Sequence, residues 1–175
     1  MADTIVVATD GSDTGHRAVD FAATLSKELG QALCVVHVLM HGRPTEEFAK
    51  MAEVEGLVKP ARKGGGTGET ADPATLDGLF PSAEDEVGAA RMIMALGEHI
   101  AESAKKRAEQ AGARDVTKRI CAGDIADEIL DVAETETADI LVMGRRGLGR
   151  VREVLLGSVS QKVLHHATCK VVIVP

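Results

Sequence analysis

The strongest constraint on the fold is an alternation of short apolar runs with segments of helical periodicity. The runs at 4–9 and 32–39 are continuously apolar, which is typical of strands buried on both faces of a sheet. Alternation of strands with helices predicts a parallel, doubly wound α/β sheet with helices on both faces. Five strands are expected, at residues 4–9, 32–39, 115–121, 139–143 and 170–174.

Capping residues and apolar stripes mark the helices between these strands. Asp10-Gly11-Ser12-Asp13-Thr14 precedes a first helix that Gly30 closes, and Gly123-Asp124 begins a later one. A long helix is expected from Ala83 to Gly112, and a short one from Ser158. The expected inward residues are Ala18, Phe21, Ala22, Leu25 and Leu29 in the first helix; Val87, Ala90, Met94, Gly97, Ile100 or Ala101, Ala104, Ala108 and Ala111 in the long one; and Ile125, Ile129, Val132 and Ala133 in the later one.

Residues 42–83 have a different composition. They hold four of the five prolines and seven glycines, with Gly64-Gly65-Gly66-Thr67-Gly68 at the centre. No strand precedes this cluster and no Lys-Ser/Thr follows it, so it lacks the context of a phosphate cradle. We expect one domain over 1–175 with a Gly/Pro-rich insertion at about 42–83, much of it loop.

Composition limits the classes of partner. The 175 residues contain no Trp, no Tyr and three Phe, which disfavours a base-stacking platform for single-stranded nucleic acid. The net charge of −7 disfavours non-specific binding to nucleic acid or anionic membrane. No stretch is long and apolar enough to span a bilayer, and the start lacks the features of a signal peptide. The odd set Cys34, Cys121 and Cys169 is expected to be reduced and structural, so a cytoplasmic location is predicted.

Positive charge is nevertheless concentrated in one place. Residues 145–153 hold Arg145, Arg146, Arg150 and Arg152 against the single acid Glu153, a local charge of +3. In doubly wound folds ligands bind at the carboxyl ends of the strands. A small basic segment after a strand of an acidic protein therefore points to a small anion.

The same segment carries a glycine pattern. Gly144 and Gly147 would let backbone N–H groups approach a ligand closely, and Gly157-Ser158 lies where a helix begins, so its N–H groups would face the same anion. The hydroxyls of Ser158 and Ser160 add donors suited to phosphate oxygens.

Two other nucleotide motifs are absent. A Rossmann GxGxxG would follow the first strand, where only Gly11 stands. Gly144 to Gly149 has the glycine spacing of a P-loop, but Arg150-Val151 replaces the required Lys-Ser/Thr.

With these residues in view, the chain resembles the universal stress protein family. Its nucleotide-binding members carry Gly-x2-Gly-x9-Gly-Ser/Thr, which Gly144, Gly147 and Gly157-Ser158 match without a gap. The opening, Ile5 to Ser12, is also similar, and the likeness covers about 1–41 and 84–175. It implies a single Rossmann-like domain of the adenine nucleotide alpha hydrolase-like type.

The resemblance also implies roles for individual residues. The expected nucleotide contacts are Ala8, Thr9, Asp10, Val38, Met143, Gly144, Arg146, Gly147, Gly157, Ser158, Val159 and Ser160. Asp10 would contact the ribose or adenine, Val38 the adenine, and the residues from Gly144 onward the phosphates. Mg²⁺ would enter with the ATP, and no metal site of the protein's own is expected. One departure from the family pattern is Lys170, where a proline is common.

Together with these residues, the resemblance implies an ATP-binding, regulatory homodimer in a stress response, with an unidentified protein partner. The resemblance implies the dimer, and the apolar strand at 170–174 would otherwise leave an exposed sheet edge. Two alternatives stay open: a slow ATPase of the same superfamily, and a nucleotide-free interaction module whose pocket the insertion blocks. No catalytic triad or carboxylate pair is recognisable, so at most weak ATP hydrolysis is expected.

Overall fold

The computed structural model describes residues 4–39, 83–147 and 156–175, and side chains of the long helix from residue 90 onward. The elements are β1 (Thr4–Ala8), α1 (Asp13–Leu29), β2 (Ala32–Leu39), α3 (Ala83–Gln110), β3 (Arg114–Ala122), α4 (Ile125–Thr135), β4 (Ala138–Gly144), α5 (Ser158–His166) and β5 (Lys170–Val174). All five predicted strands are present. The predicted insertion at 42–83 lies outside the described residues, except for Ala83 at the start of α3.

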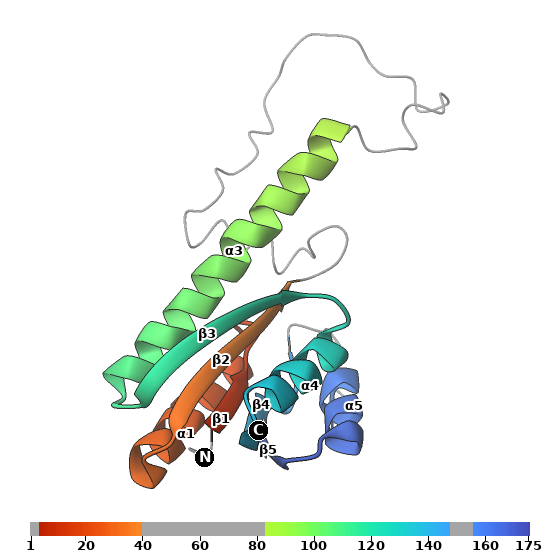
Figure 1. The fold of residues 1–175 in the computed structure, drawn as a ribbon. Helices are drawn as coiled ribbons and strands as arrows, with labels where there is room; N and C mark the ends of the chain where they lie inside the picture. Colours follow the sequence, from red (N-terminus) through yellow and green to blue (C-terminus); the bar gives the residue numbers. More distant parts are fainter. Residues whose placement is uncertain (1–3, 40–82, 148–155) are drawn as a thin grey trace, which may run out of the picture. The chain divides into compact units, whose positions relative to one another are not determined.

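The strands form one parallel sheet in the order β3-β2-β1-β4-β5 (Figure 1). The predicted doubly wound α/β fold is therefore confirmed. The chain runs from β1 outward to β3 on one side and then crosses to β4 and β5 on the other. The topological switch point thus lies between the carboxyl ends of β1 and β4, where ligands bind in such sheets.

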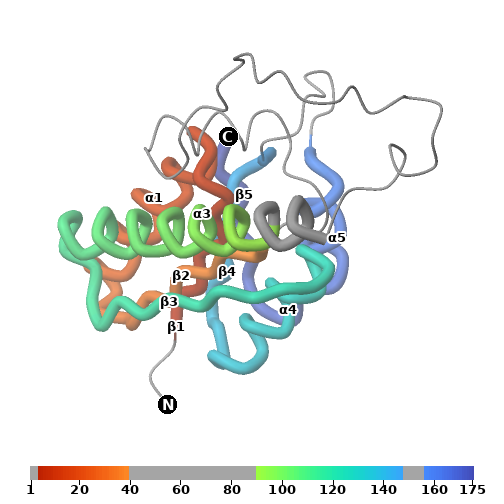
Figure 2. Tube along the Cα trace, turned by 90° about the horizontal axis from the view of Figure 1, so that it is seen from above, coloured from red at the N-terminus to blue at the C-terminus, as the bar shows by residue number. Residues whose placement is uncertain are grey.

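Helices cover both faces of the sheet (Figure 2). Each face has its own hydrophobic core. On one face, α1 and the second half of α3 pack through residues that include Ala18, Ala22 and Ala104. On the other face, α4 packs against the sheet through Ile129 and Val132, and α5 contributes Val163. The cores are aliphatic, as the composition requires.

The predicted inner stripe of α1 was partly wrong. Ala18 and Ala22 are buried, but Phe21 is 42% exposed and Leu29 is 54% exposed. The buried face consists of small residues: Gly15, Ala18, Val19, Ala22, Ala23 and Ser26. A helix that lies close to a sheet has room there for small side chains only, so the larger ones point outward.

The stripe of α3 also needed correction. Ala90, Met94 and Ala111 are exposed, whereas Ile93 and Leu96 are buried together with the predicted Gly97, Ile100, Ala101, Ala104 and Ala108. The run from Met92 to Leu96 contains no polar residue, so the sequence there does not set the phase of the helix. Val87 is among the residues whose side chains are not described. In α4, Ile125 is exposed while Ile129, Val132 and Ala133 are buried as predicted.

By compactness the chain divides into two units. The first comprises residues 1–42 and 97–175 and contains the sheet, and the second comprises residues 43–96. Of the second unit the structure describes only the helical residues from Ala83 onward. The described residues of the candidate site all belong to the first unit.

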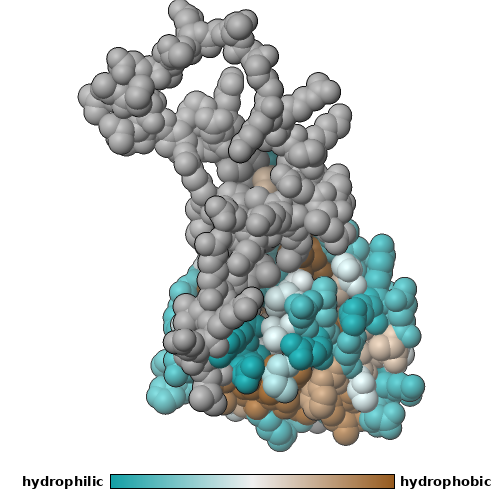
Figure 3. Space-filling view, turned by 180° about the vertical axis from the view of Figure 1, so that it is seen from behind, coloured by the Kyte–Doolittle hydropathy of each residue, from teal (hydrophilic) through white to brown (hydrophobic). Residues whose placement is uncertain are grey.

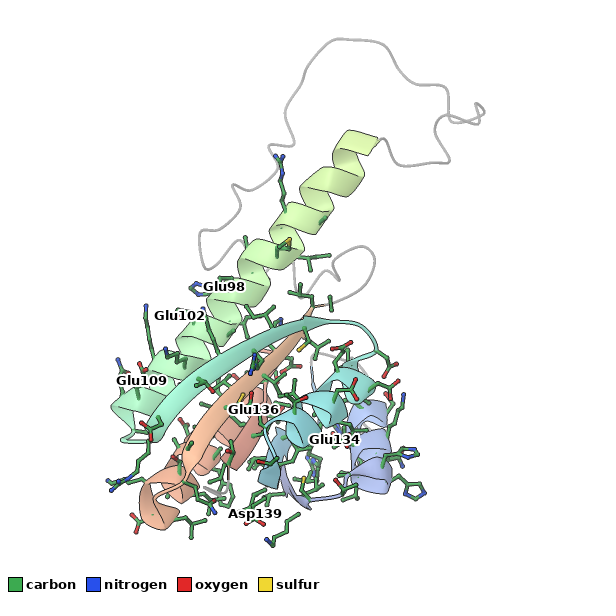
Figure 4. All side chains as sticks on the ribbon, in the orientation of Figure 1. Glu98, Glu102, Glu109, Glu134, Glu136 and Asp139 are labelled. Atoms are coloured by element: carbon green, nitrogen blue, oxygen red, sulfur yellow. The ribbon has the colours of Figure 1, made fainter. Side chains whose placement is uncertain are left out.

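The two sheet edges differ in chemistry. On β3, Lys118 pairs with Glu98 and Glu102 of α3, which Figure 4 shows beside the strand. On β5, residues 171–174 are apolar and only half-buried. Seen from behind, hydrophobic residues gather over part of the described surface (Figure 3). The unusual Lys170 at the start of β5 pairs with Asp139.

Within the described part of the chain, no helix has both the length and the apolar character needed to cross a membrane. All three cysteines are free thiols, with Cys34 buried and the other two partly buried. Burial raises the pKa of each thiol, which favours the protonated, unreactive form. This agrees with the structural role predicted for them.

Candidate functional site

The residues predicted to bind a ligand meet at the switch point of the sheet. Ala8 at the end of β1 lies beside Met143 of β4, so the loops that follow these strands start side by side. One loop carries Thr9 and Asp10, and the other begins at Gly144. We call the described part of the second loop, Gly144 to Gly147, the glycine loop.

Asp10 is held in place by the residues that begin α1. Its Oδ1 atom accepts hydrogen bonds from Ser12 N at 3.0 Å and from Ser12 Oγ at 2.6 Å. Ser12 is also the N-cap of α1, because its Oγ accepts a hydrogen bond from Gly15 N at 3.1 Å. The carboxylate is thus fixed to a rigid helix end, and its other oxygen, Oδ2, faces the glycine loop.

Gly147 approaches that second oxygen closely. A Cβ atom at this position would lie 2.4 Å from Asp10 Oδ2, too near for any side chain. Gly144 similarly packs on α1, where an added Cβ would lie 3.1 Å from Thr14 Cβ. The two motif glycines therefore allow the loop to run directly over the start of α1.

Protein donors occupy three successive carbonyl groups of the glycine loop. Ser160 Oγ lies 3.1 Å from Gly144 O and 3.3 Å from Arg145 O, and Gly157 N donates to Arg145 O at 3.0 Å. From the opposite side, Thr14 Oγ1 donates to Arg146 O at 2.5 Å. The loop is held by α1 on one side and by the start of α5 on the other.

This anchoring decides where the loop amides point. In a trans peptide the N–H points opposite to the C=O of the same unit, and the peptide bonds here are trans. The amides of Arg146 and Gly147 therefore point away from the donors that hold Arg145 O and Arg146 O. The amide of Arg145 donates to Val174 O at 2.6 Å, which ties the loop to β5.

The amino end of α5 lies beside this loop. Gly157 is its N-cap and makes no side-chain capping bond, and Ser158, the first helical residue, is exposed. The first amides of a helix lack intrahelical partners and carry the positive end of its dipole. Loop amides, a helix start and an exposed hydroxyl form a donor set that fits phosphate oxygens.

Other predicted site residues are buried at the ends of the strands, and most of them are apolar. Ala8, Thr9, Val38 and Met143 are only 5% to 7% exposed. Ala8, Val38 and Met143 belong to the same core cluster, and Val159 packs against it. Their surroundings suit contact with a flat apolar group. Ser160 is also buried, and its hydroxyl proton is used on the loop carbonyls.

His37 adds a contact that the sequence did not assign to the site. Its ring is 3% exposed, and its Nδ1 atom lies 2.9 Å from Thr9 O, next to Asp10. Burial lowers the pKa of His37, although the Thr9 carbonyl and the Asp10 charge act in the opposite direction. The neutral ring therefore donates its Nδ1 proton to Thr9, while its Nε2 atom has no partner among the described residues. The sequence contains no signal for this role, because a histidine within an apolar strand has the same pattern whether or not it bonds a neighbouring loop.

The basic segment is only partly described. Arg145 and Arg146 lie in the glycine loop, whereas Arg150 and Arg152 are outside the described residues. In the part of the chain that the structure describes, no group of three or more His, Cys, Asp or Glu side chains could hold a metal ion.

Comparison with sequences of known proteins gives consistent matches. The model of the universal stress protein family matches residues 1–64 and 67–175. The likeness thus runs through most of 42–83 and is broader than the motifs alone indicated. The universal stress protein YxiE of Bacillus subtilis (strain 168) is 31% identical over 174 residues, covering 99% of each chain. The universal stress protein Rv1636 of Mycobacterium tuberculosis is 32% identical over 171 residues, covering 98% of this chain and 94% of the relative.

Comparison of structures agrees. A solved universal stress protein in complex with cAMP is 27% identical, with a TM-score of 0.62. The similarity covers 99% of this chain and 97% of that one.

Proposed function

This chain belongs to the universal stress protein family, and on that premise we propose that it is an ATP-binding regulatory protein. The observation that carries the proposal is the convergence at the switch point. There the glycine loop meets the start of α5, with Gly157 N bonded to Arg145 O at 3.0 Å. Backbone donors from two elements would surround the phosphate chain without any lysine.

The ligand would lie across the ends of β1, β2 and β4. Its phosphates would contact Gly144, Arg146, Gly147, Gly157, Ser158, Val159 and Ser160. Its adenine and ribose would contact Ala8, Thr9, Val38 and Met143, with Asp10 accepting hydrogen bonds from hydroxyl or amino groups. Mg²⁺ would bind through the phosphate oxygens. The related structure in complex with cAMP supports an adenine nucleotide as the ligand class.

Equilibrium binding distinguishes the nucleotides. Isothermal titration calorimetry of the full chain with ATP and Mg²⁺, AMP and cAMP should give tightest binding for ATP, because the donors at the start of α5 suit a longer phosphate chain. Mass spectrometry of gently purified protein should find a co-purified adenine nucleotide. Tighter binding of cAMP would change the proposed ligand. No binding of any adenine nucleotide would overturn the proposed function.

We also propose that two copies pair through β5. Its apolar residues 171–174 are half-buried in the single chain, and pairing would cover this edge. Sedimentation equilibrium should give twice the 18.4 kDa of one chain. A monomer at micromolar concentration would contradict the pairing. Nucleotide occupancy of this dimer would control binding to a protein partner in the cytoplasm, where three free thiols stay reduced.

Slow ATP hydrolysis is a second activity to test, since the same site would hold the phosphates. Turnover should be weak and should fall in Asp10→Ala and Gly147→Val. Equal turnover in the wild type and both variants would identify a contaminating ATPase. A chain that binds no nucleotide yet captures a specific protein would favour the interaction-module alternative.

A further inference from the structure

We propose that Thr14 is a positioning residue for the phosphates: it orients the amide of Gly147 by holding the carbonyl of Arg146. This inference rests on the proposed nucleotide site and assigns a residue to it that the family motif does not include. Thr14 lies in the first turn of α1, far from the glycine loop in sequence. Its Oγ1 donates to Arg146 O at 2.5 Å, across 132 residues of chain.

The protons of the two neighbouring hydroxyl groups can be assigned. Asp10 Oδ1 and Arg146 O are acceptors, so Ser12 Oγ donates to the carboxylate at 2.6 Å and Thr14 Oγ1 donates to the carbonyl at 2.5 Å. Each hydroxyl has one proton, so neither is left for the 3.1 Å contact between Ser12 Oγ and Thr14 Oγ1. The Ser12 hydroxyl therefore donates to Asp10, and the Thr14 hydroxyl donates to the glycine loop.

Neighbouring groups hold Thr14 in place. Ser12 caps α1 just before it, and Gly144 packs on Thr14 so closely that an added Cβ would lie 3.1 Å from its carbonyl carbon. The hydroxyl thus projects from a rigid helix end toward Arg146 O. Because Arg146 O and the Gly147 N–H belong to one peptide unit, fixing the carbonyl fixes the direction of the amide.

The other loop carbonyls have separate supports. The single Ser160 hydroxyl proton is shared between Gly144 O and Arg145 O, and Gly157 N donates to Arg145 O as well. Arg146 O accepts the hydrogen bond from Thr14 Oγ1, which comes from the opposite side of the loop. Loss of the Thr14 hydroxyl should therefore remove a hydrogen bond from the peptide unit that carries the Gly147 amide, and leave the hydrogen bonds of Gly144 O and Arg145 O in place.

The test compares Thr14→Val, which keeps the shape and removes the hydroxyl, with Thr14→Ser, which keeps the hydroxyl. We expect Thr14→Val to weaken ATP binding by about 5- to 10-fold, the scale of one lost hydrogen bond. Adenosine, which has no phosphates, should bind wild type and variant equally in a competition assay. Thr14→Ser should restore ATP affinity to within about 2-fold of wild type, since the donor is retained.

A second readout needs no nucleotide. In the free protein, the NMR amide signal of Gly147 should shift and exchange faster in Thr14→Val but not in Thr14→Ser. Thr24→Val is the matched control, because Thr24 lies on the same helix and its hydroxyl donates to Asp20 O at 3.0 Å, away from the loop. This control should change neither ATP affinity nor the Gly147 signal.

The outcomes separate the two proposals. If wild type binds ATP and Thr14→Val binds it equally, or if ATP and adenosine weaken in parallel, the role of Thr14 is wrong while the nucleotide site stands. If wild type binds no adenine nucleotide, both are wrong. A selective loss for ATP with rescue by Thr14→Ser supports both.

Discussion

Replacement of Gly147 by alanine tests the contact between the glycine loop and Asp10. An added Cβ would lie 2.4 Å from Asp10 Oδ2, whereas ordinary contact begins at 3.4 Å, so the carboxylate must move by about 1 Å. Such a shift strains or breaks the hydrogen bonds from Ser12 N and Ser12 Oγ to Oδ1. Hydrogen bonds to charged groups contribute about 1.5–3 kcal/mol.

Partial relaxation of the loop reduces this cost. We expect Gly147→Ala to lower the free energy of unfolding by about 1–2 kcal/mol, in spite of the gain of up to about 1 kcal/mol from a stiffer unfolded chain. For a chain of this size the unfolding temperature should fall by about 2–8 °C. Thermal unfolding followed by circular dichroism, with chemical denaturation as a check, measures both quantities without any ligand.

A double-mutant cycle isolates the contact. In an Asp10→Ala background the carboxylate is absent, so Gly147→Ala should be neutral or slightly stabilising, and the coupling energy should be about 2 kcal/mol. Asp13→Ala is the matched control background, because Asp13 is a nearby exposed acid whose side chain does not face Gly147. Equal effects of Gly147→Ala in all three backgrounds would refute the proposed clash.

Two further predictions concern buried polar groups. Ser26 Oγ donates to Gln31 O at 2.7 Å and accepts from Arg114 N at 2.9 Å, so Ser26→Ala should cost about 1–3 kcal/mol in chemical denaturation. Thr24→Ala is the control, because it removes an exposed hydroxyl. If burial explains the effect at Ser26, this control should lower the free energy of unfolding by only about 0.5 kcal/mol. For His37, burial lowers the folded-state pKa, so the unfolded chain binds more protons and stability falls as the pH drops below about 6.5. His37→Asn, which does not titrate, should flatten this pH dependence of the unfolding free energy; an unchanged slope would exclude His37 as its source.

Much of the fold could be predicted from local patterns. The apolar runs identified every strand of the sheet, and the capping-rich loop at 10–14 and the glycine at Gly30 marked the two ends of α1 to within two residues. The glycines at 144, 147 and 157 also predicted the candidate site, and two of them occur where the backbone passes close to other groups. In the structure Gly147 lies against Asp10 and Gly144 against Thr14.

The inner faces of the helices could not be predicted as well. Large apolar residues were expected to point inward, yet Phe21 and Leu29 are exposed and the buried side of α1 is made of small residues. Hydrophobicity predicts which residues prefer burial, but the distance between the helix and the sheet decides which side-chain sizes fit between them. That distance is set by residues elsewhere in the chain.

By itself, the sequence determined the strand and helix order, the parallel sheet and the place of the glycine loop, because these depend on patterns within about twenty residues. Only the tertiary structure decided which groups form hydrogen bonds with that loop. Thr14, Ser160 and Val174 reach it from three different elements and bond to consecutive peptide units. A hydroxyl on a helix has many possible partners, and the one it bonds is fixed only when the sheet brings β1, β4 and β5 side by side.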